Sequence, residues 1–335
     1  MSEEQKLFFQ SVVVGIPVRN EEKTLYDCLL SIREAIKNSG EKNIKLVICI
    51  NGCTDNSESI AKDFKAKFLD IDCEVIESEE GLIKALKKIT ELYKADVYGF
   101  LDADALVDKN SLKLLLAALK SNSELAVAYA RTEPFFDKNN KSLFHKIGFL
   151  YDTQKLLTKR YYFHGRFFVT KDWFVPSDEE ILKRATKNRK NKVLLKYCKK
   201  GNFLNADDIF MSSYIMDKYG IKAIKQIDDA VCYAWPFGSF KDFLNIYRRR
   251  NIETEKMYRW FPEYNYLKPY LNRRTDWRKW LKANLKDKIL WFVFLFCRNL
   301  FAIFLHLEFM LLNFSFYKPQ EQWLVPLTTK KSFSG

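Results

Sequence analysis

The chain has 335 residues, of which 47% are hydrophobic and 29% charged. This length and composition allow a substantial buried core and exclude an intrinsically disordered protein. Lys and Arg total 56 against 42 Asp and Glu, and the net charge of +14 favours polyanionic partners, such as nucleotide diphosphates, anionic lipid head groups or nucleic acid. No zinc-finger, homeodomain or RNA-binding signature accompanies the basic residues, so we expect no nucleic acid partner.

The cysteines and the first ten residues indicate the cellular compartment of the protein. The seven cysteines are scattered and form no CxxC pair, which indicates a reducing environment and no structural zinc. The first ten residues hold two Glu and one Lys and lack the basic and apolar regions of a signal peptide. We therefore expect a cytoplasmic protein.

The first hundred residues alternate apolar, β-branched runs with helical periodicity. The predicted strands are 12–16, 45–50, 74–77 and 97–101, and the predicted helices are 21–37, 56–68 and 81–93. Pro17 is expected to end the first strand. This pattern predicts an α/β fold with a Rossmann-like, mostly parallel sheet flanked by helices. Ligands bind beyond the carboxyl ends of such strands, so residues 17–21, 51–55 and 102–104 are expected to meet at one edge.

The pattern is looser after residue 110. We predict strands at 126–131 and 163–170, and helices at 111–120, 141–159 and 209–219, with two shorter helical pieces in the Lys-rich segment 179–200. The predicted domains are residues 1–240, which hold the sheet, and residues 241–335, a helical C-terminal extension.

Residues 289–316 are strongly apolar but contain charged and polar residues, so no run reaches the roughly 18 residues of a membrane-spanning helix. Wound as a helix, the segment has one polar sector and a wide apolar face. It is either packed in the core or lies at a membrane interface. The basic run at 273–288 favours peripheral association with an anionic membrane surface, on the inner face of the membrane.

The motif DAD follows the apolar strand 97–101 and places two carboxylates, Asp102 and Asp104, two residues apart. Mg²⁺ and Mn²⁺ prefer oxygen ligands, and a nucleotide diphosphate could complete the coordination shell. Such a cation would neutralise the charge of the leaving diphosphate. Asp pairs at strand ends also form turns or helix caps, but the position after a buried strand favours the metal site.

A second motif, NGCTDNS, follows the strand 45–50. Gly52 allows a tight turn, and Asp55 or Asn56 can cap the helix that follows. Whether Asn51 also contacts the base of a nucleotide is left open by this pattern.

Together, the motifs IPVRNEE at 16–22, NGCTD at 51–55 and DAD at 102–104 resemble the family 2 glycosyltransferases of the GT-A fold, over roughly residues 10 to 255. The resemblance implies that Pro17 and Glu21 lie along the nucleotide and Asn51 at the base, with Asp102 and Asp104 at the diphosphate and metal. Two residues differ from the family pattern. Arg19 stands in place of an aromatic residue and Asn51 in place of an Asp, and because Asn both donates and accepts, the base is not specified.

Three later segments extend the resemblance. HGRFF at 164–168, with Gly165, resembles the strand that borders the acceptor and the donor sugar. NADDIF at 205–210 resembles the element that carries the catalytic base, which implies Asp208, with Asp207 as the alternative; an Asp pair there could also be a helix cap. YRRRN at 247–251 resembles the QxxRW element of processive members, with Arg250 as the retained arginine and Arg248 and Arg249 as alternatives. Its Gln and Trp are absent, which speaks against polymer synthesis.

The sequence thus predicts an inverting glycosyltransferase that uses Mn²⁺ or Mg²⁺, a UDP- or GDP-linked sugar donor and a hydroxyl acceptor, a glycan or lipid-linked glycan. One alternative is a sugar nucleotidyltransferase, although the segment 17–20 lacks the glycine-rich phosphate loop that such an enzyme needs. The other is a membrane-surface binding protein with a vestigial site.

Overall fold

The computed structural model describes residues 9–138, 143–154, 157–198, 203–204, 207–272, 274–311 and 330–333. Within them, one sheet of eight strands has the order β3-β2-β1-β4-β8-β6-β9-β5. Its strands are β1 (Val12–Val18), β2 (Ile44–Asn51), β3 (Asp72–Ser78), β4 (Val97–Leu101), β5 (Ala105–Val107), β6 (Val127–Pro134), β8 (Phe167–Thr170) and β9 (Ile224–Ala234). A small second sheet pairs β7 (Thr158–Lys159) with β10 (Arg274–Thr275).

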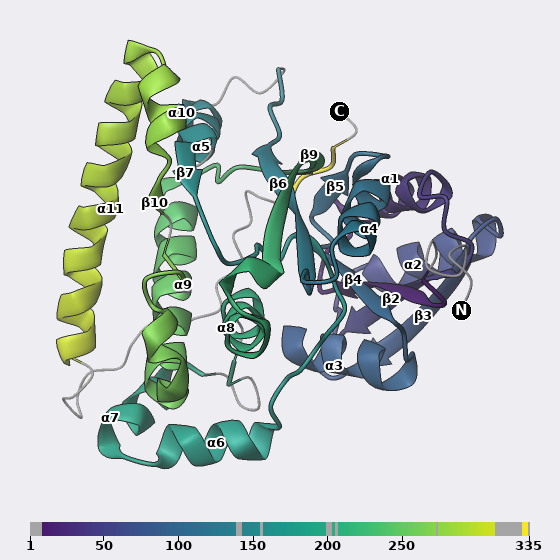
Figure 1. The fold of residues 1–335 in the computed structure, drawn as a ribbon, viewed down its shortest axis with the longest axis horizontal. Helices are drawn as coiled ribbons and strands as arrows, with labels where there is room; N and C mark the ends of the chain where they lie inside the picture. The colour runs from purple at the N-terminus through teal and green to yellow at the C-terminus, as the bar shows by residue number, and fades with distance from the viewer. Residues whose placement is uncertain are drawn as a thin grey trace.

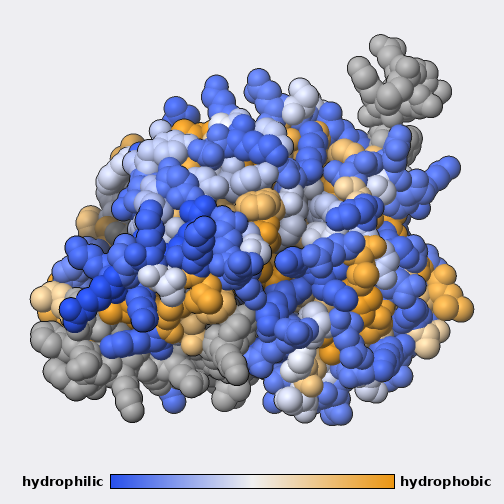
Figure 2. All heavy atoms as spheres, turned by 90° about the horizontal axis from the view of Figure 1, so that it is seen from below, coloured by the Kyte–Doolittle hydropathy of each residue, from blue (hydrophilic) through white to orange (hydrophobic). Residues whose placement is uncertain are grey.

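Helices cover both faces of the large sheet and continue beyond it (Figure 1). They are α1 (Leu25–Lys37), α2 (Ser57–Lys67), α3 (Leu82–Leu92), α4 (Ser111–Ser121), α5 (Leu143–Gln154), α6 (Asp178–Thr186), α7 (Arg189–Lys192), α8 (Asp207–Tyr219), α9 (Phe240–Trp260), α10 (Trp277–Lys282) and α11 (Leu285–Leu311). On the face of the molecule that Figure 2 shows, hydrophilic side chains predominate and apolar patches lie between them.

The predicted α/β fold with a mostly parallel sheet is confirmed. β3, β2, β1 and β4 run parallel, and β6 runs parallel to β9. β8 is antiparallel to both β4 and β6, and β5 is antiparallel to β9. Since parallel strands end at the same edge, the loops after β1, β2 and β4 lie together there.

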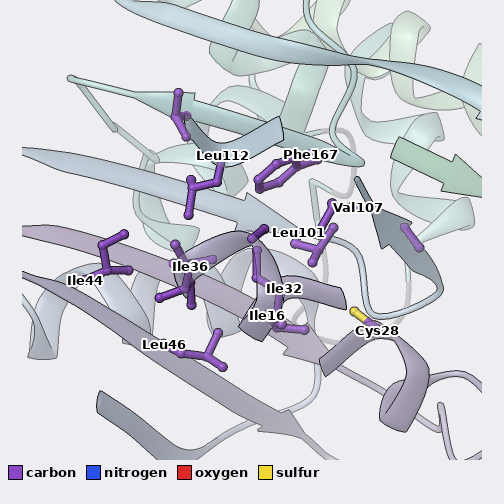
Figure 3. Close-up of a cluster of buried hydrophobic side chains, with 14 of the residues drawn as sticks. Ile16, Cys28, Ile32, Ile36, Ile44, Leu46, Leu101, Val107, Leu112 and Phe167 are labelled. Carbon is purple, nitrogen blue, oxygen red and sulfur yellow. The ribbon is translucent and has the colours of Figure 1, made fainter. Parts of the chain in front are cut away.

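The core beneath α1 shows why this half of the chain folds as the pattern predicts. Cys28, Ile32 and Ile36 recur at helical spacing, are buried, and pack on Ile16 and Leu46 of the sheet (Figure 3). On the opposite face, a second buried cluster joins α3 and the sheet to α8 and α9.

The prediction that Pro17 ends the first strand is wrong. β1 continues to Val18, and Pro17 pairs in register with Cys49 of β2. β4 pairs only with Val12 to Gly15, so Pro17 lies where β1 has a neighbour on one side alone. At that position the missing N–H of proline breaks no bond to β4.

Several predicted boundaries also differ. The first helix begins at Leu25 rather than Glu21, because residues 22–24 form a turn. The helix predicted at 141–159 ends at Gln154, and its last two residues form β7. Strand 163–170 narrows to β8, and the short β5 was not predicted, because its three residues are defined by their pairing with β9.

The C-terminal helices pack on the body of the protein. α9 buries Ile252, Met257 and Trp260 against the second core cluster. α11 runs beside α9 (Figure 1), where Glu308 accepts a 3.0 Å hydrogen bond from Nε of Arg248. None of the described helices is both long and apolar enough to cross a membrane.

Candidate active site

Asp102 and Asp104 lie in a tight turn between β4 and β5. The backbone N–H of Asp102 donates to the carbonyl of Arg166 (2.9 Å), and the carbonyl of Asp102 accepts from the N–H of Ala105 (3.2 Å). Ala103 between them is buried at 4% exposure, whereas both Asp residues are partly exposed. The turn therefore presents both carboxylates at the open edge of the sheet.

Charges of both signs surround this pair, with Asp208 on the negative side and Arg166 and Arg249 on the positive side. Burial, reinforced by the charge of Asp104, raises the pKa of Asp102 to about 7, against the opposing charge of Arg166. Nη1 of Arg166 lies 3.3 Å from Oδ1 of Asp104, and this ion pair offsets only part of the repulsion. A bound cation would favour the ionised form of both carboxylates.

Glu21, in the loop after β1, interacts with the charge of Asp104 as well. Burial and the charge of Asp104 raise the pKa of Glu21 to about 7, opposed by Lys330, whose Nζ lies 2.5 Å from Oε1. The same ammonium group donates to the carbonyls of Arg19 (2.9 Å) and Asn20 (2.7 Å). Residues near the C-terminus thus return to this edge, and no sequence pattern had pointed to Lys330.

The other predicted nucleotide residues have structural contacts. Arg19 pairs with Glu80 at 2.6 Å. Asn51 is buried at 3% exposure, and its Oδ1 accepts the N–H of Gly81 (2.6 Å), which fixes the start of α3. Pro17 is partly exposed near the end of β1. Their contacts with a nucleotide stay predictions.

Asp55 organises the turn before α2. Its carboxylate accepts the backbone N–H groups of Ser57 (3.0 Å) and Glu22 (3.1 Å). Burial alone would raise the pKa of Asp55, but these hydrogen bonds outweigh it and lower the pKa. The sequence predicted that Asp55 or Asn56 caps this helix; Asp55 accepts the N–H of its first residue, Ser57, while Asn56 stands at the N-cap position without a side-chain cap hydrogen bond. A role of Asp55 in donor binding stays a prediction.

Asp208 lies in the first turn of α8 and faces positive charge. Its carboxylate accepts hydrogen bonds from the backbone of Ile209 (2.8 Å) and of Gly165. Burial raises the pKa of Asp208, while the charges of Arg250 and Arg160 oppose that rise. Asp208 therefore lies near both Gly165 and Arg250. The side chain of the alternative base, Asp207, lies outside what the structure describes.

The three consecutive arginines of α9 have three different surroundings. Arg248 binds Glu308 of α11 and so holds two helices together. Burial lowers the pKa of Arg249, and the charges of Asp102 and Asp104 oppose that effect, so Arg249 faces the carboxylate pair. Arg250 donates to the hydroxyl of Tyr162 and interacts with the charge of Asp208.

The residues present fit a cation that also binds a ligand. Among the described residues, no group of three or more His, Cys, Asp or Glu side chains could hold a metal ion alone. Asp102 and Asp104 offer carboxylate oxygen ligands, so further ligands must come from a bound anion such as a diphosphate, or from water.

Residues 13–179 match the model of glycosyl transferase family 2. The chain belongs to this family. The match contains the donor loops, Asp104 and Gly165, and ends before Asp208 and Arg250. It confirms the resemblance seen in the sequence and makes the protein a glycosyltransferase rather than a sugar nucleotidyltransferase. A search of curated proteins found no match.

Solved structures with a similar chain path include other glycosyltransferases. The mannosyltransferase PcManGT from Pyrobaculum calidifontis, in complex with GDP-Man and Mn²⁺, is 18% identical, with 92% of this chain and 82% of that chain covered and a TM-score of 0.49. Glucosyl-3-phosphoglycerate synthase from Mycobacterium tuberculosis, with Mn²⁺, UDP-Glc and phosphoglyceric acid, is 13% identical over 76% and 80%, with a TM-score of 0.45. S. aureus TarS is 15% identical over 74% and 40%, with a TM-score of 0.43.

Proposed function

We propose that this family member is an inverting, metal-dependent glycosyltransferase that moves a sugar from a UDP- or GDP-linked donor to an acceptor hydroxyl of a glycan or lipid-linked glycan. One observation carries the proposal. The charge of Asp208 contributes to the raised pKa of Asp102, so Asp208 lies within electrostatic reach of the aspartate that follows β4. A candidate metal site and a candidate base therefore share one edge of the sheet.

In this proposal the donor nucleotide lies across the loops after β1 and β2. Pro17, Arg19, Glu21, Asn51 and Asp55 border it there. Beyond β4, the aspartate pair holds Mn²⁺ or Mg²⁺ together with the diphosphate. When bound, the ion supplies positive charge that neutralises the leaving diphosphate.

The base of the proposed reaction is Asp208. An acceptor hydroxyl becomes a good nucleophile only as its proton is removed, and a raised carboxyl pKa suits proton abstraction near neutral pH. The backbone N–H groups of Ile209 and Gly165 hold the carboxylate in place. Attack from the face opposite the diphosphate inverts the anomeric carbon in one step and needs no covalent intermediate.

The metal assignment is tested by the substitution Asp104→Asn, which preserves shape and an acceptor for Arg166. Binding of UDP-glucose and GDP-mannose is measured by calorimetry with and without Mn²⁺. We expect Mn²⁺ to strengthen donor binding in the wild type and in the control Asp63→Asn, an exposed residue of α2. Asp104→Asn should lose that enhancement. Equal enhancement in Asp104→Asn would remove the metal assignment, and no donor binding in any variant would favour a vestigial site.

We also propose that residues 1–240 form the glycosyltransferase domain and residues 241–335 a helical extension. In this proposal the extension supplies Arg249 and Arg250 to the site and attaches to the cytoplasmic face of an anionic membrane. The support is an apolar face of α11 that the described residues leave exposed, with side-chain exposures of 42–74%: Leu285, Ile289, Phe292, Val293, Phe296, Leu300, Ile303, Phe304, Leu307, Met310 and Leu311. Exposed Arg274, Arg278, Lys279, Lys282 and Lys286 lie just before this face or at its start. Apolar area beside basic residues is what an interfacial helix requires.

A further inference from the structure

A cavity of about 90 Å³ lies beside the proposed metal site, on the side of β6 and β9. Its walls come from separate parts of the chain, namely β6, β9, the end of α5, β7, the loop before β8 and α10. The volume holds several water molecules, and therefore a compact polar group of similar size.

The lining of this cavity is cationic. Four basic side chains border it, against two carboxylates, Glu133 and Asp152; the basic ones are Arg131, Arg160, Arg166 and Lys279. Arg131 pairs with Glu133 at 2.8 Å, and Arg166 lies between the charges of Asp104 and Asp152. The basic side chains of the lining therefore outnumber its carboxylates, and the lining has a net positive charge.

Several polar atoms in the lining residues are buried without a partner. Within the described part of the chain, Nε of Arg131, Oγ1 of Thr132 and Nη1 of Arg160 are shielded from solvent and have no hydrogen-bond partner. A buried guanidinium nitrogen or hydroxyl without a partner costs stability. An anion with several oxygen atoms could satisfy such donors, because arginine binds phosphate and carboxylate oxygens with paired N–H groups.

The position of the cavity separates it from the proposed nucleotide site. None of the residues from 17 to 55 lines it, whereas Arg166 connects it to Asp104 and the charge of Arg160 acts on Asp208. The cavity therefore shares none of the proposed nucleotide residues, and two of its arginines act on Asp104 and on the candidate base. A group bound there belongs to the acceptor side of the reaction.

We propose that this cavity binds an anionic group of the acceptor, a phosphate ester that also carries the hydroxyl to be glycosylated. The inference rests on the proposed function, since it assigns the acceptor class of the same site, and it replaces a glycan without phosphate by a phosphate ester as that acceptor. Arg160 and Arg131 bind the phosphate, and the hydroxyl of the same molecule reaches Asp208. The phosphate belongs to a small soluble ester or to a lipid head group, two sources that share this chemistry.

The test measures binding of inorganic phosphate to the full chain without metal, by calorimetry. Arg160→Gln should raise the phosphate dissociation constant at least about tenfold, as expected when a charged hydrogen-bond partner is lost. Arg189→Gln, which removes the same charge from an exposed site on α7, should leave it unchanged. Lys279→Gln, at an exposed position of α10, should weaken phosphate binding as well and gives a second reading if Arg160→Gln does not fold.

Competition identifies the source of the phosphate. Displacement by glycerol 3-phosphate supports a soluble acceptor, and displacement by phosphatidylglycerol vesicles, but not by phosphatidylcholine vesicles, supports a lipid one. Phosphate that binds both cavity variants as tightly as the wild type, or that does not bind the wild type at millimolar concentration, overturns the inference.

Donor binding is measured in parallel, so that the two proposals fail separately. If Arg160→Gln keeps Mn²⁺-dependent binding of the nucleotide sugar, a failed phosphate test refutes only the acceptor assignment. If Arg160→Gln instead abolishes donor binding, the cavity belongs to the donor and the inference is wrong. Loss of the Mn²⁺ effect is tested by Asp104→Asn alone and bears only on the proposed function.

Discussion

Metal binding at the aspartate pair should depend on pH near neutrality. Asp102 must be deprotonated to bind a cation, and its pKa is raised to about 7 by burial and by Asp104. Between pH 8 and pH 6 the ionised fraction of such a carboxyl falls from about nine-tenths to about one-tenth, so the affinity for Mn²⁺ should fall about tenfold. A carboxyl with its ordinary pKa would stay ionised across this range and produce almost no change.

The same shift determines how stability varies with pH before metal is added. Asp102 and Glu21 both have folded-state pKa values of about 7, above the ordinary values of 3.8 and 4.5. Between these ordinary pKa values and pH 7, the folded protein therefore binds more protons than the unfolded chain. The stability that these two groups contribute is present below their ordinary pKa values and is lost as the pH rises through 7. Bound Mn²⁺ should reverse this trend, because it stabilises the deprotonated form.

The assay follows free Mn²⁺ by electron paramagnetic resonance at pH 6, 7 and 8, with thermal unfolding recorded on the same samples. The variant Asp102→Asn should bind Mn²⁺ weakly at every pH and show no such dependence. Equal Mn²⁺ affinity at pH 6 and pH 8 in the wild type, together with no proton release on binding, would refute the reasoning.

Three further results are expected. Asp208→Asn should lower sugar transfer by at least roughly a hundredfold while donor affinity is retained, and Asp207→Asn should cost less; the reverse order in a turnover assay would move the base by one residue. Gly148→Ala should lower the free energy of unfolding by about 1–3 kcal/mol in a denaturant titration, because its Cβ would lie 2.1 Å from the carbonyl oxygen of Phe237. In liposome flotation, the protein should bind anionic vesicles in a salt-sensitive way, and Phe296→Glu should weaken that binding; equal flotation on neutral vesicles would contradict it.

The first half of the fold could be predicted from the sequence because its signals are local. Each strand of the parallel set is a short apolar run between helices, and β4 was predicted with its observed bounds, Val97–Leu101. The rule that ligands bind at the carboxyl ends of strands then placed Glu21, Asn51 and Asp102 at one edge. Pro17 was misjudged because its effect depends on which neighbouring strand is present, and the sequence does not contain that information.

The second half of the site depends on contacts between distant segments. Lys330 reaches the carbonyl of Arg19 across 311 residues of sequence, and Arg160 faces Asp208 only because α8 folds back beside the loop that precedes β8. Adjacent arginines on a helix point in directions about 100° apart. Spacing alone therefore cannot tell which of three consecutive arginines faces the site. In the structure, Arg249 and Arg250 face the candidate site, whereas Arg248 binds Glu308 of α11.

α10 contributes to the cavity and also carries exposed apolar residues just before the apolar face of α11. Lys279 lines the cavity, while Trp277 and Leu281 of the same helix are 59% and 68% exposed. The strand before α10 pairs with β7, whose Thr158 also lines the cavity. A lipid acceptor would therefore place its phosphate in the cavity and its chains along α10 and α11, which gives the apolar face and the basic lining one common role. A soluble acceptor would use the cavity alone. Anionic vesicles should then leave phosphate binding unchanged, even though the protein binds these vesicles in the flotation assay.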